Sequence, residues 1–319
     1  MNALILGAGG FIGTNLTQKL KNLYKITAYD CNISALERLY KLTNGKINII
    51  SGNLLNDSNL KKILQRQNII YHLVSTTIPA TSNKNISQEI CDNVEAMAKF
   101  LNVCSACSVN KIVFLSSGGT IYGMQNSFPI QEDAKEYPIS SYGVQKLMNE
   151  KLIYLYHFIY GLDYRIIRLS NPYGPYQNPR GKQGIVTKTI YKALKGEEIE
   201  VFGDGSIIRD YLYIDDAIDA IVKITEGNTK ERLFNVGCGI GTSLIELFQI
   251  IEESLGIPLQ LSYLPDRNVD VPVNYLNIER YKSYFGEISK IGLEDGIKKT
   301  ADYLKIYMKG TINEKGNIL

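Results

Sequence analysis

The residues of this sequence best suited to chemistry are Tyr142 and Lys146, which lie four positions apart. Residues at this spacing share one face of an α-helix, about 5–6 Å apart, so both side chains can reach one pocket. A free tyrosine hydroxyl has a pKa of about 10, and a neighbouring ammonium favours its phenolate. The spacing therefore predicts a tyrosine base assisted by a lysine. Because the chain holds 22 tyrosines, a chance pair on a solvated helix is the alternative.

Three glycines near the N-terminus, Gly7, Gly10 and Gly13, form a second motif. They lie between an apolar run at 3–6, which predicts a buried strand, and apolar residues at helical spacing over 11–21. Without a Cβ, glycines allow a tight turn, bring backbone N–H groups close to a diphosphate, and let the helix pack near the sheet. This context predicts a dinucleotide site; a glycine turn without a ligand is the alternative.

The type of dinucleotide follows from Asp30, which ends an expected strand at 25–29 and lies 23 residues after Gly7. A carboxylate there can accept hydrogen bonds from both ribose hydroxyls and repels a 2′-phosphate. The sequence therefore favours NAD over NADP as the cofactor.

Short apolar runs alternate with amphipathic helical segments through the first half of the chain. The expected strands cover residues 2–6, 25–29, 46–51, 68–74, 110–115 and 163–168. The expected helices cover residues 11–21, 34–43, 57–66, 86–108 and 141–160. This alternation is typical of an α/β protein with a doubly wound parallel sheet, the Rossmann fold.

The alternation ends after Asn171, where prolines and glycines predict a loop at the carboxyl ends of the strands, the place of a substrate lid. We expect a Rossmann domain that binds NAD, a smaller C-terminal substrate-binding domain, and a flexible tail. The expected boundaries are 1–171, with 212–240 returning to it, for the NAD-binding domain, 172–211 and 241–308 for the substrate-binding domain, and 309–319 for the tail.

Composition disfavours several classes of partner. The 319 residues are 45% hydrophobic and carry a net charge of +3 spread along the chain, which indicates neither nucleic acid nor a membrane. The chain lacks a run of about 18 apolar residues, and the first strand begins at Met1 without room for a signal peptide. We therefore expect a cytoplasmic protein with five free thiols.

Together these motifs resemble the extended short-chain dehydrogenases/reductases, and within them the NAD-dependent nucleotide-sugar epimerases typified by UDP-glucose 4-epimerase. The resemblance covers nearly the whole chain. Beyond the glycine turn and Asp30, the matching segments are 52–57, 72–75, 93–94, 115–123, 141–146, 168–175, 202–211 and 215–216.

The resemblance implies that the Tyr142 phenolate takes a proton from a sugar hydroxyl while the adjacent carbon gives a hydride to NAD. The transient 4-keto sugar then turns in the site and receives the hydride on its other face. NAD would thus stay bound as a prosthetic group. The implied reaction is C4 inversion of a UDP-hexose, such as UDP-glucose or UDP-galactose.

The resemblance also implies contacts. With NAD these come from the glycine turn, including Phe11 and Ile12, and from Asp30, Asn53, Leu54, Leu73, Val74, Asn93, Tyr142, Lys146 and Ser170. With the sugar nucleotide they come from Thr120, Asn171, Arg209, Arg267, Asp270 and Asn274. Arginine suits a diphosphate because its planar donors pair with two oxygens at once.

Two departures limit the resemblance. The family's third catalytic hydroxyl, four residues before Tyr122, falls on Gly118, which has none. Thr120, on the same side of an expected extended segment as Tyr122, or Ser117 must then bind the sugar O4, and we favour Thr120. Related dehydratases place an Asp-Glu pair, and decarboxylases a Glu, where Gly119 and Thr120 stand. Elimination therefore lacks an acid, and epimerisation remains.

The size of the sugar site depends on a family position where a large tyrosine can exclude an N-acetyl group. Counting from Asp270 and Pro272, that position falls on Asn274. The smaller side chain predicts room for UDP-GlcNAc and UDP-GalNAc as well.

Many family members form dimers through helices that correspond to 86–108 and 141–160, so a homodimer is implied. An NAD-dependent nucleotide-sugar dehydrogenase or reductase is the main alternative function, since the same motifs serve it. A non-catalytic NAD-binding protein is disfavoured because Tyr142, Lys146 and Asn93 are all present.

Overall fold

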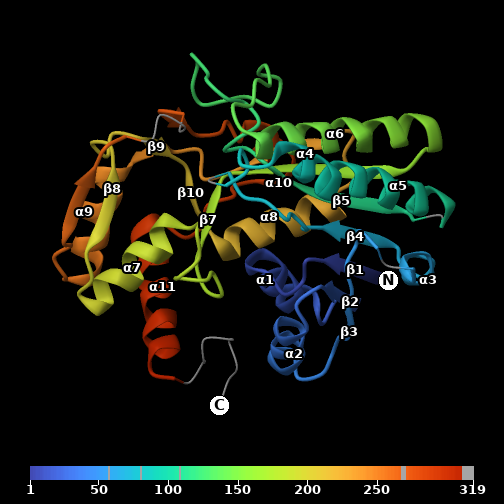
Figure 1. The fold of residues 1–319 in the computed structure, drawn as a ribbon, viewed down its shortest axis with the longest axis horizontal. Helices are drawn as coiled ribbons and strands as arrows, with labels where there is room; N and C mark the ends of the chain where they lie inside the picture. Colours follow the sequence, from blue (N-terminus) through green and yellow to red (C-terminus); the bar gives the residue numbers. More distant parts are fainter. Residues whose placement is uncertain (57, 80, 108, 267–270, 311–319) are drawn as a thin grey trace.

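A seven-stranded parallel sheet runs through the centre of the molecule (Figure 1). In sheet order its strands are β11 (Leu233–Val236), β6 (Asp163–Leu169), β5 (Lys111–Ser117), β4 (Ile69–His72), β1 (Asn2–Leu6), β2 (Lys25–Asp30) and β3 (Asn48–Ser51). This computed structural model describes residues 1–56, 58–79, 81–107, 109–266 and 271–310. The expected doubly wound α/β fold is confirmed.

The strand order reverses between β1 and β4. From β1 the chain proceeds outward to β2 and β3, then returns to β4 and continues on the other side through β5, β6 and β11. At such a reversal the crossover connections leave in opposite directions and open a crevice at the carboxyl ends of the strands. The glycine turn follows β1 at this point.

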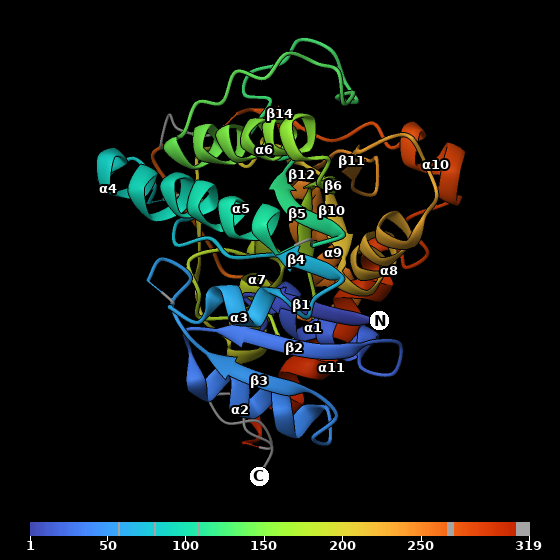
Figure 2. The ribbon, with the colours of Figure 1, turned by 90° about the vertical axis from the view of Figure 1, so that its right-hand side faces the viewer.

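Two hydrophobic cores cover the two faces of the sheet. The side chains of β1 alternate between them, with Ala3 and Ile5 in one core and Leu4 and Leu6 in the other. Figures 1 and 2 show α5 and α6 side by side on the second face. The first core is completed by α1 (Phe11–Leu20), α2 (Ile33–Leu42) and α8 (Ile214–Glu226), and the second by α3 (Leu60–Leu64), α5 (Ala96–Ala106) and α6 (Ser141–Tyr160).

The prediction of a single continuous helix over 86–108 is wrong. This segment consists of α4 (Ile86–Ile90), a π-helical turn at Cys91–Glu95, and α5. A π-turn inserts an extra residue into the helix and redirects nearby side chains and carbonyls, and such turns are frequent at functional sites. Asn93 lies within it.

The remaining elements gather at the end of the molecule beyond α8 and the carboxyl ends of the central strands (Figure 1). Short strands and helices form this part: β7 (Asn171–Tyr173) with β10 (Tyr211–Tyr213), β8 (Ile199–Phe202) with β13 (Leu261–Leu264), β9 (Ile208–Arg209) with β12 (Thr242–Ser243) and β14 (Val273–Asn274), and the helices α7 (Ile185–Lys195), α9 (Leu244–Leu255) and α11 (Leu293–Met308). Helix α10 (Glu279–Phe285) lies apart from them, beside β11 (Figure 2). Within the described ranges, no helix combines the length and apolar character needed to cross a membrane.

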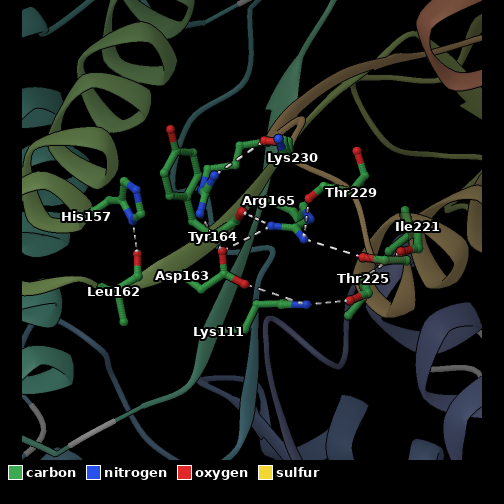
Figure 3. A network of polar contacts seen from close by, with 12 residues as sticks. Lys111, His157, Leu162, Asp163, Tyr164, Arg165, Ile221, Thr225, Thr229 and Lys230 are labelled. Atoms are coloured by element: carbon green, nitrogen blue, oxygen red, sulfur yellow. Dashed lines mark hydrogen bonds and ion pairs between the residues drawn. The ribbon is translucent and has the colours of Figure 1, made fainter. Parts of the chain in front are cut away.

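A polar network at the amino ends of β5 and β6 joins the sheet to the end of α8 (Figure 3). Lys111 donates from Nζ to the Thr225 carbonyl oxygen at 2.9 Å and lies 3.7 Å from Asp163. Arg165 pairs with Asp163 at 3.1 Å and donates to the Gly227 carbonyl oxygen at 3.4 Å. Because this network occupies the amino ends, it fixes the sheet from the side opposite to the crevice.

Candidate active site

The glycine turn between β1 and α1 has the geometry that a diphosphate requires. Gly7 has a φ of +82°, a conformation that favours glycine. A Cβ on Gly13 would lie 2.2 Å from the Gly7 carbonyl oxygen, so only glycine allows α1 to approach the turn this closely. Gly10 is the N-cap of α1 and has no side chain to cap it. The first N–H groups of α1 can therefore donate to an anion.

Asp30 ends β2 beside this turn. Its Oδ2 accepts from the Gly9 N–H and its Oδ1 from the Asn32 N–H, each at 2.9 Å. A carboxylate oxygen has two lone pairs, so each can still accept a ribose hydroxyl.

Two cavities meet at the carboxyl ends of the strands. Tyr142 and Lys146 line both of them. The smaller, about 360 Å³, is lined by the predicted cofactor residues Gly7, Gly10, Asp30, Asn53, Leu54, Leu73, Val74 and Asn93. The larger, about 770 Å³, is lined by the predicted residues Phe11, Ile12, Gly13, Ser117, Thr120, Ser170, Asn171 and Arg209. The predicted cofactor residues thus border both cavities, whereas the substrate residues Thr120, Asn171 and Arg209 border only the larger one.

Helix α6 presents this pair. The helix begins at Ser141, and the N-cap Ser140 accepts the Gly143 N–H on its side-chain oxygen at 3.2 Å. Lys146 Nζ lies 5.6 Å from the centre of the Tyr142 ring and donates to the Leu115 carbonyl oxygen at 2.9 Å. This hydrogen bond to β5 fixes the ammonium next to the tyrosine.

Burial opposes ionisation of both groups in the free protein. It raises the pKa of Tyr142 to about 12, an effect partly offset by a hydrogen bond with Ser117. Burial also lowers the pKa of Lys146 to about 8, and the charge of Glu150 opposes that shift. Lys146 therefore remains mostly charged at neutral pH, while Tyr142 needs further positive charge nearby to become a phenolate.

A buried ion-pair network behind α6 escaped the sequence interpretation. Arg168 on β6 is fully buried, and its Nη2 lies 2.7 Å from Glu150 Oε2 and 2.8 Å from Glu136 Oε1. Its guanidinium carbon lies 4.8 Å from the centre of the Tyr122 ring. Glu150 lies one helical turn after Lys146, so helical spacing could have indicated that its side chain faces the interior as well.

The π-turn brings Asn93 to the loop that follows β4. Its Oδ1 accepts from the Thr76 N–H at 3.0 Å, and its Nδ2 donates to the Thr76 hydroxyl at 2.8 Å. The amide thereby holds this loop at the edge of the smaller cavity.

Two amides of α6, Gln145 and Asn149, also line the smaller cavity and were not predicted. Both are buried, and within the described chain neither Gln145 Oε1 nor Asn149 Oδ1 has a hydrogen-bond partner. They lie three and seven positions after Tyr142, on the same helical face, so helical periodicity could have identified them.

The expectation of an extended segment at Thr120 is wrong, because residues 118–120 form a turn after β5. Thr120 nevertheless lies on the wall of the larger cavity, and its Oγ1 is buried without a partner in the described chain. A Cβ on Gly118 would lie 2.5 Å from Leu276 Cδ1 and 3.2 Å from the Arg168 carbonyl oxygen, so a side chain at 118 would require Leu276 to move.

The structure describes only some of the remaining predicted residues, namely the substrate residues Asn171 and Arg209 and the cofactor residue Ser170. Asn171 donates from Nδ2 to the Asp210 carbonyl oxygen at 3.0 Å, and Arg209 donates from Nη1 to the Val271 carbonyl oxygen at 2.7 Å. Ser170 Oγ is buried without a partner among the described residues. Arg267 and Asp270 lie outside the described residues.

Asn274 does not border either cavity as the structure describes them. It is fully buried in β14, and its Nδ2 donates to the Gly118 carbonyl oxygen at 3.1 Å. Asn274 pairs with Arg209 in the register of β14 against β9. That Asn274 sets the size of the sugar site stays a prediction.

His72 ends β4 and packs its ring 5.3 Å from that of Phe100, measured between centres. Burial, and then the charge of Lys146, lower its pKa to about 3. No group of three or more His, Cys, Asp or Glu side chains could hold a metal ion among the described residues.

His72 should make the fold sensitive to acid. The unfolded chain binds a proton at about pH 6.5 whereas the folded chain resists it, so stability is present above that pH and is lost as pH falls toward 3. We expect a loss of about 2 kcal/mol between pH 6.5 and 4.5 from this residue. Denaturant unfolding of the wild type and of His72→Gln at both pH values measures it. Parallel losses in the two proteins would contradict the assignment.

The glycine turn, Asp30 and the Tyr142–Lys146 pair thus border one cavity of a Rossmann fold. Residues 3–237 match the model of the NAD dependent epimerase/dehydratase family. The chain therefore belongs to this family, whose members depend on NAD.

Similar proteins act on nucleotide sugars. The structure of a UDP-glucose 4-epimerase from Thermotoga maritima, solved with UDP-glucose, is 31% identical with a TM-score of 0.89, covering 96% of this chain and 99% of that one. A UDP-glucuronic acid 4-epimerase from Bacillus cereus, solved with UDP-glucuronic acid and NAD, is 27% identical with a TM-score of 0.87 and the same coverage. A dTDP-4-dehydro-6-deoxyglucose reductase from Escherichia coli is 32% identical, covering 93% of this chain and 95% of the relative.

Proposed function

We propose that this protein is an NAD-dependent epimerase that inverts C4 of a UDP-hexose. The observation that carries the proposal is the position of Tyr142 and Lys146 at the junction of two cavities. A hydride transfer needs both the cofactor and the sugar beside the base, and the two cavities, which also share Gly7 and Gly10, provide room for both next to this pair. The similar UDP-sugar 4-epimerases support the substrate class.

The residues fit NAD along the glycine turn, which borders both cavities. The N–H groups at the start of α1 face a diphosphate, and the free lone pairs of Asp30 suit ribose hydroxyls. The unpartnered Oγ of Ser170 and the amide of Asn93 lie where the nicotinamide end would be held. NAD bound there would supply the hydride acceptor and, once reduced, the hydride donor of the reaction.

The chain's own residues handle the proton. Tyr142 takes the proton of the sugar C4 hydroxyl, and Lys146 stabilises the phenolate by charge. Thr120 offers an unpartnered hydroxyl on the wall of the larger cavity, and Ser117 offers one beside Tyr142. Either hydroxyl can replace the one that Gly118 cannot carry. We assign sugar O4 to Thr120 and the orientation of Tyr142 to Ser117.

The test is an incubation of the purified protein with UDP-glucose or UDP-GlcNAc without added NAD, followed by separation of the sugar nucleotides. We expect the C4 epimer without net NADH, together with NAD released on denaturing the protein. Failure of both sugars to epimerise, with NADH accumulating once NAD is supplied, would replace the epimerase by a dehydrogenase. The faster of the two substrates decides whether N-acetylated sugars belong to the site.

A second candidate function is reduction of a 4-keto nucleotide sugar. Two observations favour it: the reductase from Escherichia coli is as similar to this chain as the epimerases are, and the third family hydroxyl is missing at Gly118. A reductase consumes one NADH per sugar, so loss of absorbance at the NADH band with a dTDP-4-keto-6-deoxy sugar would identify it. An epimerase leaves that band unchanged with its own substrate.

We also propose a homodimer formed through α5 and α6. One face of α6 exposes a row of apolar side chains, among them Val144, Met148, Leu155 and Phe158, the last with 78% of its surface accessible. Their spacing places them along one side of the helix, as an interhelical contact requires. Analytical ultracentrifugation of the wild type and of Phe158→Glu tests this: we expect a dimer and a monomer, respectively.

The division into domains is likewise a proposal. Residues 1–171 and 212–240 would form the NAD-binding unit, which the pairing of β11 with β6 supports. Residues 172–211 and 241–308 would form the substrate-binding unit. We place the enzyme in the cytoplasm, since NAD and UDP-sugars are its proposed ligands.

A further inference from the structure

Gly9 lies in the middle of the glycine turn. Hydrogen bonds hold the peptide group before it and the peptide group after it. The Gly9 N–H donates to Asp30 Oδ2 at 2.9 Å. The Gly9 carbonyl oxygen accepts from Nη2 of Arg38, on helix α2, at 3.0 Å. In the same peptide group the Gly10 N–H donates to the Gly7 carbonyl oxygen at 3.2 Å. Because a peptide group is planar, these partners fix its orientation.

Arg38 also joins the turn to α1. The same Nη2 donates to the hydroxyl of Thr14 at 3.2 Å, and Thr14 is fully buried in the second turn of that helix. Gly9 itself packs against α2, since a Cβ on it would lie 2.7 Å from the Cβ of Ala35. One guanidinium nitrogen therefore connects α2, the turn and α1.

We propose that Arg38 is a positioning residue for the dinucleotide: it locks the turn before ligand binding and thereby sets how tightly NAD is held. The inference rests on the proposed NAD site at this turn. The N–H groups that would face the diphosphate follow Gly10 directly, and their direction depends on the plane of the Gly9–Gly10 peptide. When that plane is fixed during folding, binding does not have to order it, which raises affinity. An epimerase needs such affinity, because its cofactor must remain bound through each turnover.

The test is isothermal titration of NAD into the full-length protein freed of bound nucleotide. We expect Arg38→Met to raise the Kd for NAD about tenfold or more, because a charged hydrogen bond is lost. The number of NAD molecules bound per chain should stay the same as in the wild type. Arg38→Lys should recover most of the affinity, because an ammonium on a similar stem can donate to the Gly9 oxygen. Lys41→Met, an exposed position on the same helix, serves as the matched control and should match the wild type.

Three results would overturn the inference. The first is an unchanged Kd in Arg38→Met. The second is a reduced number of binding sites with unchanged Kd, which indicates a folding defect. The third is an effect that disappears at high salt, which indicates long-range attraction of the diphosphate rather than a fixed turn. NAD binding is measured without sugar. The titration therefore tests the role of Arg38 even if the protein proves not to be an epimerase.

Discussion

Replacing Tyr142 by phenylalanine is expected to lower kcat by about 10²–10⁴-fold, the usual contribution of a positioned acid–base group. The ring remains to pack in α6, and only the hydroxyl that takes the sugar proton is lost. Lys146 Nζ keeps its hydrogen bond to the Leu115 carbonyl oxygen. The Kd for NAD should therefore stay within a few-fold of the wild type, whichever nucleotide sugar is turned over.

Steady-state kinetics with the sugar found active, together with NAD titration, measure this prediction. Tyr154→Phe is the matched control, since Tyr154 lies on the same helix and is 56% exposed. Full activity in Tyr142→Phe would remove the tyrosine from the chemistry and return the pair to a structural role. Loss of NAD binding along with activity would show that the hydroxyl holds the cofactor instead.

The second large effect is on stability. Arg168→Met is expected to lower the free energy of unfolding by about 3–5 kcal/mol, the cost of breaking a buried ion pair. The side chain of Glu150 is only 2% exposed, so the loss of Arg168 leaves a carboxylate in the protein interior without its nearest cation. Glu136 is less affected, because it is partly exposed and also pairs with Lys151 at 3.4 Å.

Denaturant unfolding of three variants tests this account. Arg66→Met, at an exposed position, should unfold like the wild type. The double variant with Arg168→Met and Glu150→Met should recover much of the loss, because it removes both charges rather than one. Equal losses in the single and double variants would mean that shape, and not charge, makes Arg168 important.

Local patterns were sufficient to predict the fold class and the two chemical motifs. Strand and helix periodicity depends on near neighbours in the sequence, and the spacing between Tyr142 and Lys146 is a property of one helix. The turn around Gly7 was equally readable, since a positive φ and a close helix approach require glycine at fixed positions.

The sequence did not predict local structure that depends on residues far apart in the chain. Residues 118–120 form a turn in which Gly118 packs against Leu276, more than 150 positions away. The burial of Asn274 in β14, which pairs with β9, was likewise not readable from the local sequence. The π-turn around Asn93 interrupts a segment whose composition is typical of a continuous helix.

The sequence by itself determined the groups on which the proposed chemistry depends: a glycine turn for a diphosphate, a carboxylate at Asp30, and a lysine one helical turn from a tyrosine. Only the tertiary structure decided how these groups act together. It brought both cavities to Tyr142, buried Arg168 behind α6, and set Arg38 against Gly9. The physical reason is range: hydrogen-bonded turns and helical faces are set within a few residues, whereas burial, pKa shifts and cavity walls depend on residues that meet only when the chain has folded.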